Sequence, residues 1–247
     1  MKKITYIRPP KDLSRQLRGL YQRVADRVGV DAQYVRQVAL GKRESPLVEE
    51  ALTKEVAKIV EQGTASPSVH QAHFYSEDQV LLDRLIPLIA SALKRGDPAL
   101  VVATKAHQEA LEKGLKLEGL DIRVATNEGR YTSIDAIGTL SIFMVNGTPE
   151  PARFFRIVGA LIEEALKTAK TSQPRLAIFG EWVSVLCAKG QVEAAIRLEQ
   201  LWGQLAARYE VDLLCGYDMS SMNREAHPLD FKRLCDEHSR ICVEGKL

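Results

Sequence analysis

The chain has 247 residues, with 34 Lys and Arg against 32 Asp and Glu, and 45% of its residues are hydrophobic. This length suits one small and one medium domain, each with its own core. No apolar run approaches the roughly 20 residues that cross a bilayer, and the first residues lack the apolar segment of a secretory signal, so we expect a cytoplasmic protein without a membrane partner.

Charge is distributed unevenly along the chain. Residues 1–43 hold 11 Lys and Arg against 3 Asp and Glu, a net charge of +8, and the remainder carries −6 because the whole chain carries +2. A basic N-terminal part next to an acidic body is typical of a protein whose N-terminal part binds nucleic acid phosphates. A solvated basic face is the alternative interpretation.

Residues 11–62 predict consecutive helices, and the stretch "VADRVGVDAQYVRQVALGKRES" at residues 24–45 fits a helix-turn-helix. Ala25 is the small residue where the second helix packs, Gly29 supplies the turn, and Asp31 is a suitable N-cap for the second helix. The apolar side chains that would clamp the two helices are Val24, Val28, Val30, Val35 and Val38. Together these offsets are much more specific than any single residue.

The outward side of that second helix predicts contacts with double-stranded DNA. The candidate DNA-binding residues are Gln33, Tyr34, Arg36, Gln37, Lys42 and Arg43. Gln and Arg suit adenine and guanine edges in the major groove, and Lys42 and Arg43, beyond a possible helix cap at Gly41, would lie near phosphates. A helical hairpin used for dimerisation or protein docking is the alternative. Residues 11–60 resemble the lambda-repressor-like helix-turn-helix domains, in which "YVRQVALGKRES" is similar to the recognition helix and its exit.

From Gly63 the composition changes to "GTASPSVHQ", which predicts a linker. We place a helix-turn-helix domain at residues 1–62, the linker at 63–70 and a second domain at 71–247. In this second domain, helical segments alternate with strands predicted at "ALVVAT", "DIRVA", "RLAIFG" and "VDLLCGYD". "SIDAIGTLSIFMV" is expected to be helical, and "PLDFKRLCDEHSRIC" to form a final helix. The alternation predicts a three-layer α/β domain with a mainly parallel sheet.

Neither GxxxxGK[ST] nor GxGxxG occurs in the chain, so the phosphate-binding loop of an ordinary ATPase is missing. Several separated segments between residues 70 and 242 resemble the MEDS family of sensory domains, named for methanogen and methylotroph regulators of the DcmR type. These segments are "HFYSEDQVLLDRLIPLIASALKRGDPALVVATKAH", "SIDAIGTLSIFMVNGTPEPARFF", "AIFGEWVSVLCAKGQVEAAIRLEQLWGQL" and "LLCGYDM". The resemblance implies a KaiC/RecA-like fold without a Walker A motif that senses small hydrocarbon-derived ligands.

Candidate ligand-binding residues follow the predicted strands, where the open side of a parallel sheet forms a crevice. They are His73, Tyr75, Thr104, Lys105, His107, Glu181 and Trp182. Glu181 stands out because a carboxylate directly after a buried strand needs a partner. Each has an ordinary alternative: His73 and Tyr75 as packed sheet residues, Trp182 as core, and Glu181 bonded to helix N-termini or His73.

The cysteines Cys187, Cys215, Cys235 and Cys242 form no CxxC pair, so we expect reduced thiols. Cys235, His238 and Cys242 would share one face of the predicted C-terminal helix and could supply three metal ligands. No fourth ligand is visible nearby, and a packed helix face is the favoured interpretation. We therefore predict neither a metal nor a cofactor.

These features predict a DNA-binding transcriptional regulator that responds to a small molecule, acts as a homodimer and is not an enzyme. One alternative is a degenerate nucleotide-binding enzyme that uses Glu181 and His73 as acid and base. Another is a signalling adaptor whose helical N-terminal part only dimerises.

Overall fold

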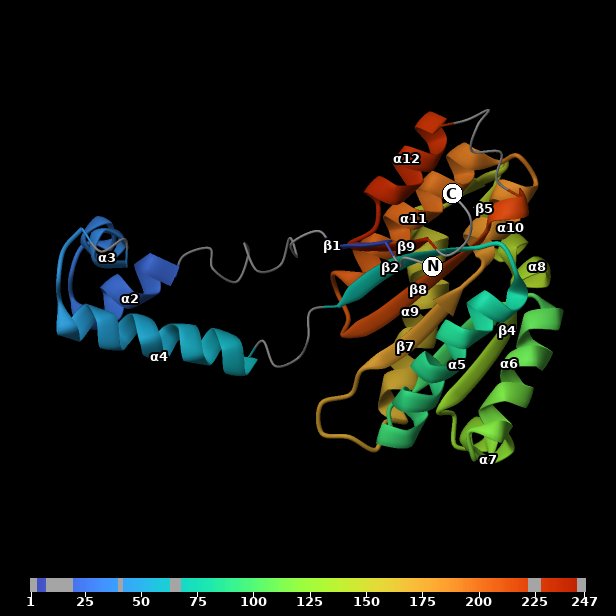
Figure 1. Cartoon of the computed structure of the whole chain (residues 1–247), viewed down its shortest axis with the longest axis horizontal. Coiled ribbons are helices and arrows are strands. Elements are labelled where there is room, and N and C mark those ends of the chain that lie inside the picture. The colour runs from blue at the N-terminus through green and yellow to red at the C-terminus, as the bar shows by residue number, and fades with distance from the viewer. Residues whose placement is uncertain (1–3, 8–19, 40–41, 63–67, 222–227, 244–247) are drawn as a thin grey trace. The chain divides into compact units, whose positions relative to one another are not determined.

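The computed structural model describes residues 4–7, 20–39, 42–62, 68–221 and 228–243. The chain divides into two compact units, one comprising Pro9–Pro67 and the other Met1–Arg8 with Ser68–Leu247 (Figure 1). Each unit has its own hydrophobic core. None of the described helices is both long and apolar enough to cross a membrane.

The described part of the smaller unit is helical. It contains α2 (Leu20–Val28), α3 (Ala32–Ala39) and α4 (Pro46–Gln62). Val24 and Ala25 of α2 and Val35 and Val38 of α3 are buried together in one core. Because these residues recur at helical spacing, each helix turns one apolar stripe inward.

A three-residue turn joins α2 to α3. The N–H groups of Gly29 and Val30 both donate to the Ala25 carbonyl, at 2.8 and 3.1 Å, and Gly29 has φ = +74°, a conformation that favours glycine. Asp31 then caps α3, as expected, because its Oδ1 accepts the Gln33 N–H at 2.7 Å. Gly41 and any helix between residues 8 and 19 lie outside the described residues.

A buried carboxylate fastens α4 to α2. Glu55 is 6% exposed and accepts hydrogen bonds from Arg23 Nε at 2.8 Å and Arg27 Nη2 at 2.7 Å. The two guanidinium groups are charge-assisted donors, which makes these contacts stronger than neutral hydrogen bonds. They fix α4 across a helical unit whose core is small.

The larger unit is built on a seven-stranded sheet in the order β1-β9-β2-β8-β7-β3-β4. Strand β1 pairs antiparallel with β9, and the other neighbouring strands pair in parallel. The strands are β1 (Ile4–Ile7), β2 (Val69–Tyr75), β3 (Ala99–Ala103), β4 (Tyr131–Asp135), β7 (Leu176–Gly180), β8 (Val211–Asp218) and β9 (Arg240–Val243). A separate short hairpin consists of β5 (Met144–Val145) and β6 (Thr148–Pro149).

Helices cover both faces of this sheet (Figure 1), which gives the expected three-layer α/β arrangement. One face packs against α5 (Asp78–Arg95), α6 (Lys105–Leu117) and α7 (Ile122–Asn127). The other packs against α8 (Ala136–Thr139), α9 (Pro151–Lys167), α10 (Trp182–Ala188), α11 (Val192–Ala206) and α12 (Pro228–Asp236). Short 3-10 turns occupy Leu140–Ile142 and Met219–Ser221. The continuous apolar sequence of β3 and β7 follows from this double burial.

Three element predictions were wrong. "DIRVA" is not a strand but lies within α7, because the Asp121 carboxylate accepts the Val124 N–H and caps a helix. "SIDAIGTLSIFMV" is not one helix: it begins in edge strand β4, continues through α8 and reaches β5. The C-terminal helix ends at Asp236, so Cys235, His238 and Cys242 do not share one helix face, and Cys242 lies in β9.

The strands also depart from the expected segment boundaries. Ile4–Ile7 forms β1 of the larger unit, although residues 1–62 were assigned to the helical domain. Strand β2 begins at Val69, inside the linker predicted at residues 63–70. The helical unit is therefore inserted between two strands of the same sheet, which the linker-like composition alone did not reveal.

We predict that Glu55→Gln destabilises the helical unit by about 1–2 kcal/mol, because it weakens both charge-assisted bonds to α2. Amide hydrogen exchange in α2 and α4 would measure the loss. Glu50→Gln is the matched control on the same helix. Among the described residues Glu50 pairs with the exposed Lys54 alone, so this substitution should change protection little. Equal effects of the two substitutions would contradict the role given to Glu55.

Candidate functional site

Glu181 joins several strands at the carboxyl edge of the sheet. It directly follows β7 and is 2% exposed. Its Oε2 accepts the backbone N–H of Thr104 at 2.6 Å, and Oε1 lies 3.4 Å from the Tyr75 hydroxyl and within hydrogen-bond reach of His107 Nδ1. Tyr75 ends β2 and Thr104 follows β3, so parallel strand pairing brings these groups together.

His107 connects Glu181 to the start of α5. Its other ring nitrogen, Nε2, lies 3.2 Å from Oδ1 of the exposed Asp78. The hydrogen bond to Glu181, assisted by the charges of Glu181 and Asp78, raises the pKa of His107 to about 9 against the opposing effect of burial. The imidazole is therefore protonated at neutral pH, and it neutralises a buried carboxylate.

Tyr75 completes this group as a neutral donor. Burial and the neighbouring negative charge of Glu181 raise the pKa of its phenol well above the ordinary value. We call Tyr75, Thr104, His107 and Glu181 the carboxyl-edge group. Its donors and acceptors already satisfy one another, so it holds the beginnings of α5 and α6 against the sheet.

The remaining predicted ligand-binding residues lie apart from the carboxyl-edge group or play other packing roles. His73 is fully buried in β2, and its ring lies 6.3 Å from that of Tyr75. Lys105 is exposed at the first position of α6. Trp182 points into the opposite core, where Nε1 donates to Thr139 Oγ1 at 3.1 Å and the indole stacks 5.8 Å from Trp202.

The predicted DNA-binding residues lie on α3 and directly after it. Gln33 and Arg36 are exposed, and Tyr34 and Gln37 are half-buried. Lys42 and Arg43 are exposed, and the Arg43 guanidinium lies 5.5 Å from the centre of the Tyr34 ring. This cation–π contact restrains two of the candidate residues against each other. The described residues therefore place a polar and basic surface over a short helix.

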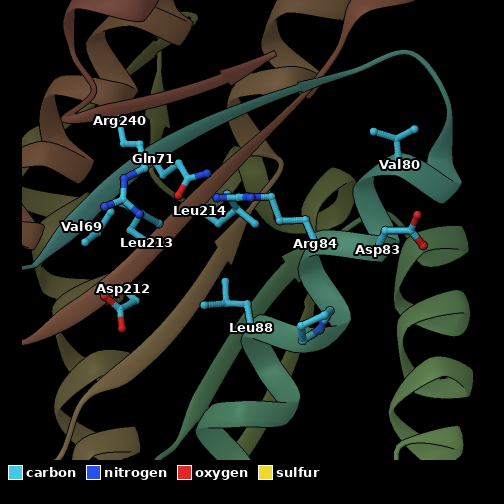
Figure 2. Close-up of a pocket in the computed structure, with 11 residues that line it drawn as sticks. Val69, Gln71, Val80, Asp83, Arg84, Leu88, Asp212, Leu213, Leu214 and Arg240 are labelled. Atoms are coloured by element: carbon cyan, nitrogen blue, oxygen red, sulfur yellow. The ribbon is translucent and has the colours of Figure 1, made fainter. Parts of the chain in front are cut away.

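A cavity of about 370 Å³ lies elsewhere, between α5 and the amino-terminal halves of β2, β8 and β9 (Figure 2). Its lining combines apolar and charged residues: Val69, Gln71, Val80, Asp83, Arg84, Pro87, Leu88, Asp212, Leu213, Leu214 and Arg240. Figure 2 shows the Arg84 side chain extending from α5 over the sheet toward Leu214 and Gln71. None of the ligand-binding residues predicted from the sequence lines this cavity.

Several polar groups of the cavity wall can form further hydrogen bonds or ion pairs. Gln71 is 6% exposed, and its Nε2 has no hydrogen-bond partner among the described residues. Within that same part of the chain, Arg84 and Arg240 form no ion pair, whereas Asp212 is already bonded to Arg175 at 2.8 Å. A buried donor without a partner is costly, so this wall favours a ligand that brings acceptors.

A sequence signal for the cavity exists but is subtle. Arg84 lies four residues after Val80 and four before Leu88, so these three half-buried residues form one line along α5, beside the buried stripe that packs on the sheet. An arginine between two apolar residues at this spacing indicates a partly polar surface next to the core. The strand residues of the wall, Gln71 and Arg240, give no comparable signal because their neighbours come from distant parts of the chain.

We predict that His107 makes stability depend on pH. The pKa of His107 is about 9 in the folded protein and 6.5 in an unfolded chain, so its protonation stabilises the folded state. This contribution to the free energy of unfolding is complete below pH 6.5 and is lost as the pH rises through 9. Urea unfolding on both sides of this window should show a fall on the order of 2 kcal/mol in the wild type and little fall in His107→Gln. Lys105→Gln replaces an exposed neighbour on α6 and should show the same fall in the free energy of unfolding as the wild type. If Lys105→Gln removed the pH dependence, a group other than His107 would be responsible.

Comparisons with known proteins point to one family. No sequence among the curated proteins matches the chain. Residues 69–228 match the family described as MEDS, the methanogen/methylotroph, DcmR sensory domain. The match begins at the first residue of β2 and includes the carboxyl-edge group and most of the cavity wall. Because it spans well over half of the chain, the protein belongs to the MEDS family of sensory domains.

Proposed function

We propose that the chain is a ligand-responsive, DNA-binding regulator of transcription whose α/β unit binds a small molecule in the cavity beside α5. The observation that carries the proposal is the cavity itself, whose wall offers the guanidinium groups of Arg84 and Arg240 and the Gln71 Nε2, which has no partner in the described part of the chain; all but Arg240 lie within the residues matched to the sensory family. An enzymatic role is not part of the proposal.

The chemistry of the cavity wall favours a small organic anion. Arg84, Arg240 and Gln71 supply donors, and Arg guanidinium groups bind carboxylates and phosphates well. Val69, Leu88 and Leu214 supply apolar surface for a hydrocarbon portion. A short-chain organic acid could bind the polar residues through its carboxylate and the apolar residues through its hydrocarbon chain. Such an acid belongs to the hydrocarbon-derived ligands that the family resemblance implies.

The helical unit supports the DNA-binding part of the proposal. Gln33 and Arg36 are exposed on α3, and Asp31 and Gly29 hold the turn that precedes it. We propose that α3 is the recognition helix of a lambda-repressor-like helix-turn-helix and enters the major groove. Lys42 and Arg43 would then contact phosphates, and the protein would pair two half-sites as a homodimer.

Ligand binding would regulate DNA binding by shifting a population. A ligand that binds one conformation more tightly than another favours it by the difference in affinity. We propose that the α/β unit has a KaiC/RecA-like fold, and since GxxxxGK[ST] is missing, the switch would not require nucleotide hydrolysis. A signalling adaptor would share this cavity but would not need the polar surface of α3.

We predict that Arg36→Ala combined with Gln37→Ala weakens binding to the upstream region of the protein's own gene by about 100-fold or more, because two base-reading side chains are lost. Fluorescence anisotropy at several salt concentrations would measure it, with the oligomeric state checked in parallel. Arg123→Ala, an exposed arginine on α7, is the control for lost positive charge. Salt-independent or absent binding by the intact chain would contradict the DNA-binding proposal and favour the adaptor.

We further predict that short-chain organic acids raise the melting temperature, whereas matched neutral alcohols do not, because only the acids engage Arg84. Thermal unfolding with a panel of such compounds would test this. Arg84→Gln should abolish the shift and Arg123→Gln should preserve it. A shift that survives Arg84→Gln would place the ligand outside this cavity.

A further inference from the structure

We propose that His70, Glu199, Cys215 and His238 form a binding site for a divalent transition-metal ion, best suited to Zn²⁺. These residues come from β2, α11, β8 and the segment between α12 and β9. All are buried, and one ligand atom from each lies within 4.8 Å of the others. The site is independent of the proposed regulatory function.

The distances between ligand atoms fit tetrahedral coordination. Glu199 Oε2 lies 2.9 Å from His70 Nε2, 3.4 Å from His238 Nε2 and 3.5 Å from Cys215 Sγ. Cys215 Sγ also lies 3.5 Å from His70 Nε2. With metal–ligand bonds of about 2.0–2.3 Å, neighbouring ligands of a tetrahedral Zn²⁺ are roughly 3.3–3.6 Å apart. Of these four distances only the 2.9 Å contact is shorter, and His238 lies within 4.8 Å of the ligand atoms of His70 and Cys215. A tetrahedral ion requires that Glu199 and His70 separate by about half an ångström and that His238 reach the same spacing from its two other neighbours.

The groups behind the ligands are arranged as in metal sites. His238 Nδ1 is 2.7 Å from the Leu234 carbonyl oxygen, which fixes it as a donor and leaves Nε2 with a free lone pair. Tyr217 donates to the second carboxylate oxygen of Glu199 and leaves Oε2 toward the other ligands. His238 Nε2 has no hydrogen bond among the described residues, although it is buried. A metal ion would satisfy this atom.

The charge and chemical type of the four ligand atoms favour Zn²⁺. Two imidazoles, a thiolate and a carboxylate are ligands that Zn²⁺ accepts, and four protein ligands are typical of a closed structural site. When the ion binds, the Cys215 thiol loses its proton to solvent. The thiolate and carboxylate then cancel the charge of the cation, so the buried complex is neutral.

The site lies directly behind the cavity, on the other face of the same strands. His70 precedes Gln71 in β2, and Cys215 follows Leu214 in β8, so each strand contributes one residue to the metal site and an adjacent residue to the cavity. His238 lies shortly before Arg240, which also lines the cavity. Metal binding would therefore hold the strands of the cavity wall in register with one another.

The experiment uses the untagged full-length chain, produced in medium supplemented with Co²⁺, a spectroscopic substitute for Zn²⁺. We expect about one cobalt ion per chain by elemental analysis, with thiolate-to-cobalt charge-transfer absorption and the visible bands of tetrahedral Co²⁺. Cys215→Ser should lose the charge-transfer absorption, and His238→Gln should lose most of the bound cobalt. Cys187→Ser, a substitution of another buried cysteine outside the site, should retain both signals.

A folded wild-type protein without stoichiometric metal or charge-transfer absorption would overturn the proposal and leave the cluster as a proton-sharing network. Loss of the absorption in Cys187→Ser, or its persistence in Cys215→Ser, would overturn it as well, because the thiolate ligand would be a different cysteine. If Cys215→Ser does not fold, the wild-type spectrum and His238→Gln still decide the outcome.

Discussion

Burial of the parallel sheet on both faces is the constraint from which the other features of the α/β unit follow. Because consecutive strand residues point to opposite faces, a buried polar side chain of a central strand needs a partner from one helical layer or from a bound molecule. Glu181 meets His107 and Tyr75 at the edge covered by α5 and α6. Glu199 meets His70 in the opposite layer. Both carboxylates lie in the interior only because partners are fixed around them.

This constraint explains why the carboxyl edge and the cavity are separate. Glu181 uses its oxygens on groups of the protein itself, so the edge where open α/β sheets commonly bind ligands is occupied by internal contacts. At the other end of the sheet, the amino-terminal halves of β2, β8 and β9 and the helix α5 line the cavity. The Gln71 amide lies there without a hydrogen-bond partner for its Nε2 among the described residues. The polar groups at the carboxyl end of the sheet are therefore paired with one another, whereas the amino-terminal end has a buried donor without a partner among the described residues.

The sequence predicts those parts of the molecule whose burial is uniform. The continuous apolar runs at Ala99–Ala103 and Leu176–Gly180 predict central strands, and the parallel-sheet rule predicts that Thr104, His107 and Glu181 converge. Edge strand β4 was missed because its alternating exposure and polar residues resemble a loop or helix start. The cavity and the His70–Glu199 contact depend on which distant segments become neighbours, which local patterns do not encode.

Strand β1 has a practical consequence for any attempt to isolate the α/β unit. It pairs with β9 along Ile4–Ile7, and the chain returns to the same sheet at β2 after the helical insertion. A fragment that starts at Ser68 would lack β1 and leave one side of β9 with unpaired backbone N–H and C=O groups. Exposed strand edges of this kind pair readily with other molecules. Self-association of such a fragment would then result from the missing strand and not from a property of the intact protein. An isolated α/β unit should therefore contain both Met1–Arg8 and Ser68–Leu247, joined by a short loop.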